Sequence, residues 1–457
     1  MAMGKRHRQE QEPLFISAAE MPQSPGHPYY QAVNALLASH GFDDWVEEAC
    51  QKFYAQEMGR PSLAPGVYFR CLLIGYLEGI NSERGIAWRV ADSLSLRRYL
   101  GIPLNEDTPD HSTLSRTRRL LDLETHQRVF TWMLKVLAVR GLVSGKTVGI
   151  DATTLEANAA LRSIVRQDTG QTYDDFLKAL AQASGIDTPT REELAKIDKT
   201  RKNKASNDDW HNPHDPDAKI TKMKDGTTHL AHKAEHAVDL TPGSAGAVLA
   251  VTLQPADEGD TTSWRETVEE ACTQLNAVAA DPVTAPKVHE KPVEELVTDK
   301  GYHSNQTLAD YREIGIRSYV SEPDRGRRDW EGKEQEREAV YANRRRVRGE
   351  RGKRLLRRRG EFLERSFAHC YETGGLRRTY LRGHENILKR LLVHVAGFNL
   401  SLVLRRVLGR GTPRGFQGRC TPLWGLLAAL FFTLRRWDHH LRRWASAHDE
   451  SGTLAAA

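Results

Sequence analysis

Residues 147–158 read TVGIDATTLEAN, and this stretch decides the fold expected for the chain. Its β-branched beginning predicts a buried strand that ends at Asp151. A second short run, residues 295–298 in EELVTDKGYHS, predicts another strand that ends at Asp299. A third acidic residue, Glu364, lies in GEFLERSFAHCYETGG, where apolar residues recur at helical spacing. We therefore expect two strand ends and a helix to bring three carboxylates together.

Between these two predicted strands, two runs of alternating apolar and polar residues flank a glycine-containing turn and predict a β-hairpin. They are THLAHKAEHAVDL from residue 228 and GAVLAVTLQPAD from residue 246. An amphipathic stretch after residue 260 predicts a helix, and IRSYV at residues 316–320 predicts a further strand. Strand, hairpin, helix, strand, helix, strand and helix make an α/β arrangement with a mixed sheet. This order resembles an RNase H-like catalytic core, which we expect over residues 146–410.

Other segments flank or interrupt this core. Residues 25–145 carry apolar side chains at helical spacing and predict an all-helical N-terminal domain after a basic tail, residues 1–24. Residues 158–226, rich in Lys, Asp, Asn and Pro, predict an insertion between the first two core strands that is mobile or ordered by DNA. Its Trp210 is expected to pack within its own domain, with base stacking as the alternative. Residues 411–457 match no motif and are expected to be a helical extension of unknown role.

The composition, 39% hydrophobic and 28% charged with a negative mean hydropathy, predicts a soluble globular protein. Five scattered cysteines without a CxxC pair exclude a zinc ribbon and a disulfide framework, and fit a reducing cytoplasm. The N-terminus lacks the apolar run of a signal peptide. The apolar run LWGLLAALFFTL, residues 423–434, is too short to span a bilayer. We expect a cytoplasmic protein with no membrane partner.

Positive charge is concentrated in residues 343–359, NRRRVRGERGKRLLRRR, which hold ten Lys or Arg against one Glu. This run leads into the helix that carries Glu364, so a polyanion bound there would lie beside the carboxylates. A helix after PDHS, near residue 116, is also basic, although an ordinary exposed face is an equal alternative. The predicted DNA-binding residues are Arg116, Arg118, Arg119, Arg344, Arg345, Arg346, Arg348, Arg351, Lys353, Arg354, Arg357, Arg358 and Arg359.

Other polar groups offer competing sites. His229, His232 and His236 would share one face of a helix and suit zinc, but on a strand the first two point to opposite sides. The strand is favoured. Five further aspartates are rivals for the second carboxylate: Asp215, Asp217, Asp239, Asp257 and Asp260. Of these, Asp260 is more simply a helix cap.

Several motifs in order resemble the DDE transposases of bacterial insertion sequences, in the superfamily of the insertion-sequence-four and insertion-sequence-five groups. They are GINSERGIAWRVADSLSLRRYLGI, PDHSTLSRTR, GIDATTLEANAA, DPDAKITKMKDGTTHLAHKAEHAVD, VTDKGYHS and ERSFAHCYETGGLRRTYLRGHENILKR. The resemblance covers residues 14–410. It implies a bacterial, nucleoid-associated enzyme that binds the terminal inverted repeats of its element, cuts the ends and joins them to target DNA. It also implies a homodimer or larger assembly on paired ends.

The resemblance implies that Asp151, Asp299 and Glu364 bind two Mg²⁺ ions, with Mn²⁺ as a substitute. Carboxylates that hold two such ions are the equipment of in-line phosphoryl transfer. Glu385 is the alternative third carboxylate, because neither glutamate reproduces the Tyr, Arg, Glu and Lys spacing of the related groups. Two other functions remain open: a catalytically inactive repressor derived from a transposase, and a metal-dependent nuclease that cuts without joining.

Overall fold

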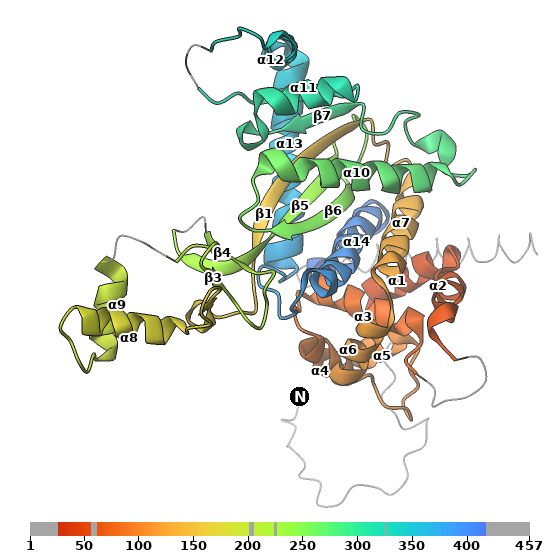
Figure 1. Ribbon diagram of the computed structural model, residues 1–457. Coiled ribbons are helices and arrows are strands. Elements are labelled where there is room, and N and C mark those ends of the chain that lie inside the picture. Colours follow the sequence, from red (N-terminus) through yellow and green to blue (C-terminus); the bar gives the residue numbers. More distant parts are fainter. Residues whose placement is uncertain are drawn as a thin grey trace, which may run out of the picture.

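Figure 1 shows the computed structural model, which describes residues 26–416 apart from 56–61, 201–204, 224–225, 325 and 327. A helical region, a mixed sheet covered by helices on both faces and an outlying insertion make up this part of the chain. The expected basic tail and the apolar run of the C-terminal extension lie outside the described residues.

The core is a sheet in which six described strands pair. The strands are β1 (Thr147–Glu156), β4 (Lys219–Lys222), β5 (Thr228–Asp239), β6 (Val248–Pro255), β7 (Glu295–Thr298) and β8 (Arg317–Val320). Their order is β4-β5-β1-β7-β8, and β6 also pairs with β5. Strand β1 is antiparallel to β5 and parallel to β7, which is parallel to β8. The predicted mixed sheet and the predicted hairpin, formed by β5 and β6, are therefore both present.

Strand β1 is longer than the sequence predicted. It continues past Asp151 to Glu156 because β5 pairs with it along almost its whole length. Strand β7 pairs only with residues Thr147 to Gly149 of β1, in a register that sets Gly149 opposite Val297. Two more residues along each parallel strand bring Asp151 beside Asp299, and the even step keeps both on the same face. The prediction that β1 ends at Asp151 was wrong, but the two aspartates still meet.

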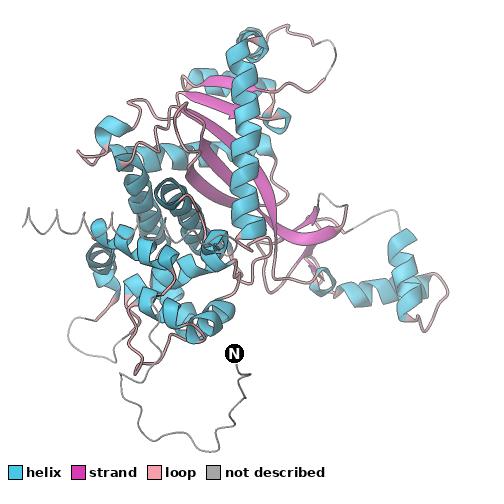
Figure 2. Ribbon diagram, turned by 180° about the vertical axis from the view of Figure 1, so that it is seen from behind, coloured by secondary structure: helices cyan, strands magenta, loops and turns pink. Residues whose placement is uncertain are grey.

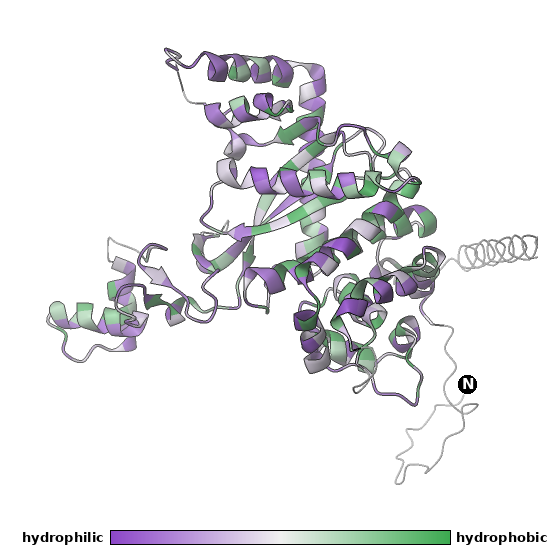
Figure 3. Cartoon of the chain, turned by 45° about the vertical axis from the view of Figure 1, so that its right-hand side comes forward, coloured by the Kyte–Doolittle hydropathy of each residue, from purple (hydrophilic) through white to green (hydrophobic). Residues whose placement is uncertain are grey.

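Helices cover both faces of the sheet. Helix α13 (Glu350–Phe367) crosses one face, where it contacts β5, β1, β7 and β8, and Figure 2 shows it in front of the strands. Helices α10 (Asp260–Ala279), α14 (His384–Leu408) and α7 (Leu123–Val139) lie on the other side, as Figure 1 shows. In Figure 3 hydrophobic residues gather on the strands and on the helices packed against them. Helices α11 (Asn305–Glu313) and α12 (Glu334–Arg348) flank β8.

A buried asparagine pairs with one edge residue of β6 and another with one edge residue of β8. The side-chain amide of Asn399, on α14, donates to the carbonyl of Val248 in β6 at 2.8 Å and accepts its N–H at 2.9 Å. Asn343 of α12 makes the same pair of bonds with Val320 of β8, at 2.8 and 3.0 Å. These amides satisfy edge groups that would otherwise be free to pair with another strand.

The helical region is built on well-capped short helices. They are α1 (Pro28–Ser39), α2 (Phe42–Cys50), α3 (Pro65–Glu78), α4 (Glu83–Ala91), α5 (Leu94–Leu100) and α6 (His111–Leu120). Ser82 caps α4 and Asp110 caps α6, each accepting backbone N–H groups of the first turn, as NSER and PDHS predict. One hydrophobic core runs from α1 through the sheet to α14. It is therefore continuous across residue 145, where the sequence predicts the helical domain to end.

Helix α14 is the central helix of this core. The segment His384–Phe416 is long and apolar enough to cross a membrane, but 94% of its most apolar window is buried inside the protein. Its close contact with α3 needs small residues, because a side chain at Gly397 would collide with the ring of Tyr76. These contacts identify α14 as a core helix.

The insertion is a folded unit with its own apolar cluster, at the left of Figure 1. It contains β2 (Val165–Arg166), α8 (Tyr173–Ala183), α9 (Arg191–Thr200) and β3 (Trp210–His211), and its last strand, β4, joins the main sheet. Trp210 is 3% exposed and makes edge contacts with Tyr173 and Phe176, both at 5.2 Å between ring centres. The packing predicted for Trp210 is confirmed.

Burial strongly affects three histidines of the described structure: His126 on α7, His236 on β5 and His394 on α14. Burial lowers the pKa of His126 to about 4 and the pKa of His236 and of His394 to about 3. All three are therefore neutral in the folded protein at pH 5 to 7. The unfolded chain binds a proton on each below about pH 6.5, so stability falls as the pH drops from there towards the folded pKa values.

Acidification from pH 6.5 to pH 5 should lower the free energy of unfolding by about 1.4 kcal/mol per pH unit for each of these histidines. Urea unfolding at pH 7, 6 and 5 measures the slope. His126→Gln should reduce this slope by about 1.4 kcal/mol per pH unit, the contribution of one proton. Equal stability at pH 7 and pH 5 would contradict this expectation.

Candidate active site

Asp151 and Asp299 converge on one guanidinium group. The Nη2 atom of Arg359, on α13, lies 2.9 Å from Oδ2 of Asp151 and 3.9 Å from Oδ2 of Asp299. Its Nε donates to the carbonyl of Ile150 at 3.3 Å, whereas Nη2 makes no directed hydrogen bond within the described structure. The contact with the aspartates is therefore an ion pair. It is nearly buried on the arginine side, with a side chain 11% exposed.

The two carboxylates remain open to solvent, since the side chains of Asp151 and Asp299 are 28% and 42% exposed. Local hydrogen bonds orient each of them. Oδ1 of Asp151 accepts the N–H of Ala152 at 2.9 Å, and Oδ1 of Asp299 accepts the N–H of Gly301 at 2.8 Å. Two oriented carboxylates reachable from solvent provide hard oxygen donors of the kind that bind Mg²⁺ or Mn²⁺.

The third predicted carboxylate lies apart from this pair. Glu364 is exposed and follows Arg359 by five residues. In a helix of 3.6 residues per turn, this spacing turns the two side chains roughly 140° apart, so they point in different directions. No three His, Cys, Asp or Glu side chains are grouped to hold a metal in the part of the chain that the structure describes. The alternative, Glu385, begins α14 and pairs with Lys389 at 2.6 Å. The structure thus brings two of the three predicted carboxylates together.

The rival aspartates have other partners. Asp260 does not cap α10, since Gly259 is the N-cap residue, and instead its carboxylate lies 2.7 Å from Nζ of Lys233. Asp239 is buried and accepts the N–H groups of Ser144 and Gly145. Asp217 accepts the N–H of His384, and Asp257 is exposed in the turn before α10. Asp217, Asp239 and Asp260 are therefore held in contacts within the fold.

The three histidines of β5 do not converge, as the strand prediction required. His229 lies 3.8 Å from Glu156, and His236 lies between Ser366 and Tyr371, at 3.1 and 2.6 Å. His232 is fully buried between Asp215, at 3.3 Å, and His384, at 3.1 Å.

Asp215 belongs to the same buried cluster. Burial alone would raise the pKa of its carboxyl group, but hydrogen bonds from His232 and from the N–H of Gly383 hold that pKa below its ordinary value. The cluster therefore carries a charged aspartate that ties the insertion to the start of α14. No three side chains grouped to hold a metal are found among the described residues of this cluster.

The basic residues of α6 have different environments. Arg118 is buried, pairs with Glu83 at 2.8 Å and donates to Oδ1 of Asn386 at 2.8 Å. Arg116 and Arg119 are exposed. The prediction that Arg118 contacts DNA was wrong, because its guanidinium joins α6 to α4 and α14; the periodicity of one helix could not show which arginine faces inward.

The basic run breaks at Gly349 into α12 and α13. Five of its residues hold these helices against the sheet, and Arg359 is one of them. Arg344 binds Glu322 through two bonds of 2.6 and 2.7 Å, which hold the pKa of that carboxyl group below its usual range. The others donate to Ser318, Glu295 and Thr241; they are Arg346, Arg351 and Arg358. The remaining residues are exposed: Arg345, Arg348, Lys353, Arg354 and Arg357.

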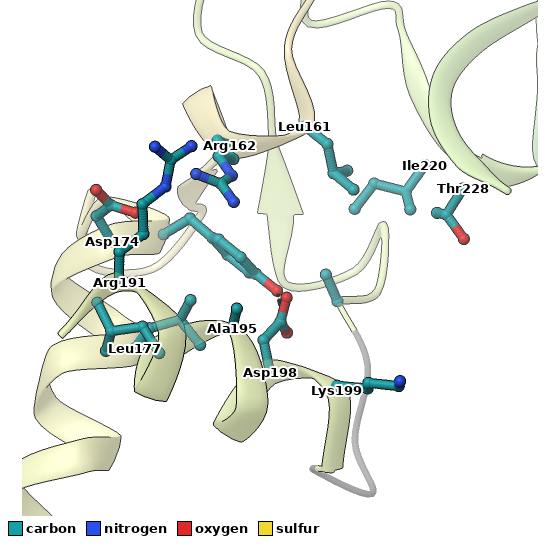
Figure 4. Close-up of a pocket in the computed structure, with 13 residues that line it drawn as sticks. Leu161, Arg162, Asp174, Leu177, Arg191, Ala195, Asp198, Lys199, Ile220 and Thr228 are labelled. Atoms are coloured by element: carbon teal, nitrogen blue, oxygen red, sulfur yellow. Dashed lines mark hydrogen bonds between the residues drawn. The ribbon is translucent and has the colours of Figure 1, made fainter. Parts of the chain in front are cut away.

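The insertion contains a pocket of about 870 Å³ between α8, α9 and the base of the unit (Figure 4). The hydroxyl of Tyr173, which lines this pocket, donates to Oδ1 of Asp198 at 2.7 Å. Arg162 and Arg191 lie at its rim. None of the predicted catalytic residues lines this pocket, so it is separate from the aspartate pair.

Comparison with known proteins identifies part of the helical region. Residues 21–120 match a family model described as a transposase domain (DUF772). The match supports a transposase. It spans α1 to α6 and stops before the sheet, so it does not reach Asp151, Asp299 or Glu364. No curated protein and no solved structure matches the chain.

Arg118→Ala should lower the free energy of unfolding by about 3 kcal/mol, because it leaves Glu83 buried without its partner. Arg116→Ala and Arg119→Ala are matched controls from the same helix and should change it by less than about 0.5 kcal/mol. Urea unfolding at pH 7 compares the three variants. A stability of Arg118→Ala equal to that of the controls would contradict the structural role.

Proposed function

We propose that this chain is a DNA transposase of the DDE type, which cuts the terminal inverted repeats of its element and joins the 3′ ends to target DNA. The observation that carries the proposal is the aspartate pair, set side by side by the register of β1 and β7 and holding a cation between them. The transposase-domain match supports it independently. The strand order β6-β5-β1-β7-β8, with the hairpin antiparallel and β7 and β8 parallel to β1, is compatible with an RNase H-like core.

The aspartate pair fits a divalent metal ion. Asp151 and Asp299 offer carboxylate oxygens, and the guanidinium of Arg359 occupies the place where their combined charge attracts a cation. Bound Mg²⁺ would polarise the phosphodiester and lower the pKa of a water molecule. In this proposal the two aspartates hold the metal, while Arg359 is released to pair with a DNA phosphate beside them.

Glu364 remains the proposed third carboxylate. Gly360, one turn earlier on α13, has no atom within 4 Å of the place of a Cβ, so this side of the helix is open. DNA and metal binding would have to bring Glu364 towards the pair by a shift of α13 or of its side chains. Cleavage breaks the bond between phosphorus and the 3′ oxygen by attack of water, and joining repeats the displacement with the freed 3′ hydroxyl as nucleophile.

Double-stranded DNA is the proposed partner. The exposed arginines of α12 and α13 lie on the same two helices as Arg359, so phosphates held by them would lead towards the aspartates. They are Arg345, Arg348, Arg354 and Arg357. We further propose that the chain works as a homodimer or larger assembly, because two ends must be joined to one target.

One observation favours a second function. Because Arg359 pairs with both aspartates and Glu364 lies apart, the described structure also suits a DNA-binding repressor without catalysis. A nuclease that cuts without joining would share the same residues. Cleavage and joining assays separate the three functions.

Asp151→Asn and Asp299→Asn should each reduce cleavage and joining of DNA carrying the element's ends by more than about a hundredfold, since even partners of metal ligands cost 10- to 100-fold. End binding should persist in both. Glu364→Gln and Glu385→Gln, compared in the same assay, identify the third carboxylate as the one whose loss stops the reaction. Wild-type protein that binds ends with Mg²⁺ but never cuts would establish the repressor.

Removal of the competing guanidinium should strengthen metal binding. We expect Mg²⁺ at 10 mM, taken as on the order of 100 times the dissociation constant, to stabilise the Arg359→Ala variant by about 2.7 kcal/mol. The same concentration should stabilise the wild-type protein by less. Thermal unfolding with and without Mg²⁺ measures this. Asp151→Asn combined with Arg359→Ala should abolish the gain, and Arg345→Ala is the control for loss of an exposed arginine. Equal Mg²⁺ responses of wild type and Arg359→Ala would argue against a metal between the aspartates.

A further inference from the structure

The motif GGLRRTYLRG, residues 374–383, forms a loop that is fixed against the end of β1. Glu156, the last residue of β1, donates its N–H to the carbonyl of Arg377 and accepts the N–H of Thr379, both at 3.0 Å. The side chain of Asn158 donates to the carbonyl of Tyr380 at 3.1 Å. The backbone of this loop is therefore held in place without help from the outward side chains.

The loop has an inner and an outer side. Thr379 is 2% exposed and Leu381 is half-buried, whereas the residues between and around them are exposed: Arg378, Tyr380 and Arg382. This alternation is that of an extended segment with one packed side. The ring of Tyr380 is 47% exposed, and the guanidinium of Arg378 lies 5.8 Å from its centre. The cation–π contact orients the guanidinium, and exposed arginines bind the phosphates of DNA.

Arg377 links the loop to the aspartate pair. Its Nη1 donates to Oγ1 of Thr153 at 2.9 Å and to the carbonyl of Thr154 at 3.0 Å. Thr153 lies two residues after Asp151, so both side chains are on the same face of the sheet, about 7 Å apart along the strand. Positive charge thus continues from the pair to the loop.

Several acidic residues lie beside the arginines of this loop. Glu372 pairs with Arg377 at 2.5 Å, and Glu156 lies 3.5 Å from Arg378. Arg382 is exposed, and its Nε lies 3.4 Å from the carbonyl of Asn158. Asp217 adds an acidic group at the end of the loop, where it accepts the N–H of His384. The exposed guanidinium groups of Arg378 and Arg382 are the outward positive charges of the loop.

We propose that Arg378, Tyr380 and Arg382 form a second DNA contact, about five base pairs from the phosphodiester bond held at Asp151 and Asp299. The distance follows from β1, because Glu156 is five residues past Asp151, or about 17 Å at 3.3 Å per residue. Duplex DNA rises 3.4 Å per base pair. The inference rests on the proposed function, since it places the scissile bond at the aspartates.

The test uses the full chain, its element's end as a duplex, and EDTA, so that position on DNA is measured without cleavage. Hydroxyl-radical footprinting should show protection about five base pairs from the cut site. Tyr380→Ala should weaken binding, because the ring no longer orients Arg378, while Tyr380→Phe should keep it. The double variant Arg378→Ala and Arg382→Ala should reduce the slope of log affinity against log salt by about 2 and lose the same protection.

Arg265→Ala is the matched control. Arg265 is exposed on α10, with its guanidinium 4.9 Å from the ring centre of Trp264, on the opposite face of the sheet. This variant should leave affinity and footprint unchanged. A measurement on wild-type protein guards against variants that fail to fold: DNA with 5-iodouracil four to six base pairs from the cut site should photo-crosslink to residues 376–383.

The outcomes separate this inference from the proposed function. End binding with no crosslink to the loop, and with a footprint that the loop variants do not change, would overturn the inference and leave the transposase proposal standing. Failure of the wild-type chain to bind the element's ends would overturn both. Loss of the protection near the fifth base pair in the loop variants, but not in Arg265→Ala, supports the inference.

Discussion

The parallel pairing of β1 with β7 is the constraint on which the candidate site depends. Three paired residues fix the register, and the strands then carry Asp151 and Asp299 to adjacent positions on one face. A slip of one residue in either strand would turn one carboxylate to the face of α10. Strand β5 holds β1 straight past Asp151, so the aspartate sits within a rigid strand and not on a loose end. The asparagines that pair with one residue each of β6 and β8 satisfy edge groups of the same sheet.

Arg359, which lies between the two aspartates, balances the negative charges that the strand register brings together. Two carboxylates this close repel one another unless a cation lies between them, and a nearly buried guanidinium is itself costly unless it is paired. Arg359 and the two aspartates therefore need each other in the metal-free protein. A metal ion would offer the same compensation with a higher charge. In the proposed enzyme, a metal ion and Arg359 would therefore compete for the same place between the aspartates.

The sequence predicted those features that depend on local patterns. β-branched runs placed β1 and β7, alternation placed the β5–β6 hairpin, and cap residues placed the starts of α4 and α6. Features that depend on packing against distant elements could not be predicted from local sequence patterns. The length of β1 is set by its partner β5, the burial of Arg118 by Glu83 and Asn386, and the outward direction of Glu364 by the apolar face of α13. Helical spacing places a residue on a helix but does not say which face meets the sheet.

Strand β1 also links the site to the surface around it. One end of the strand lies under the basic helix α13, and the other is extended by the loop of Arg378 and Tyr380. A duplex lying along β1 would meet exposed arginines on α13, the aspartate pair and then the loop, in that order. Phosphate contacts on both sides of a scissile bond restrict its position more than contacts on one side, because a duplex held at two points cannot pivot about either. In the proposed complex, β1 would thus set the distance between the scissile bond and the DNA contact of the loop.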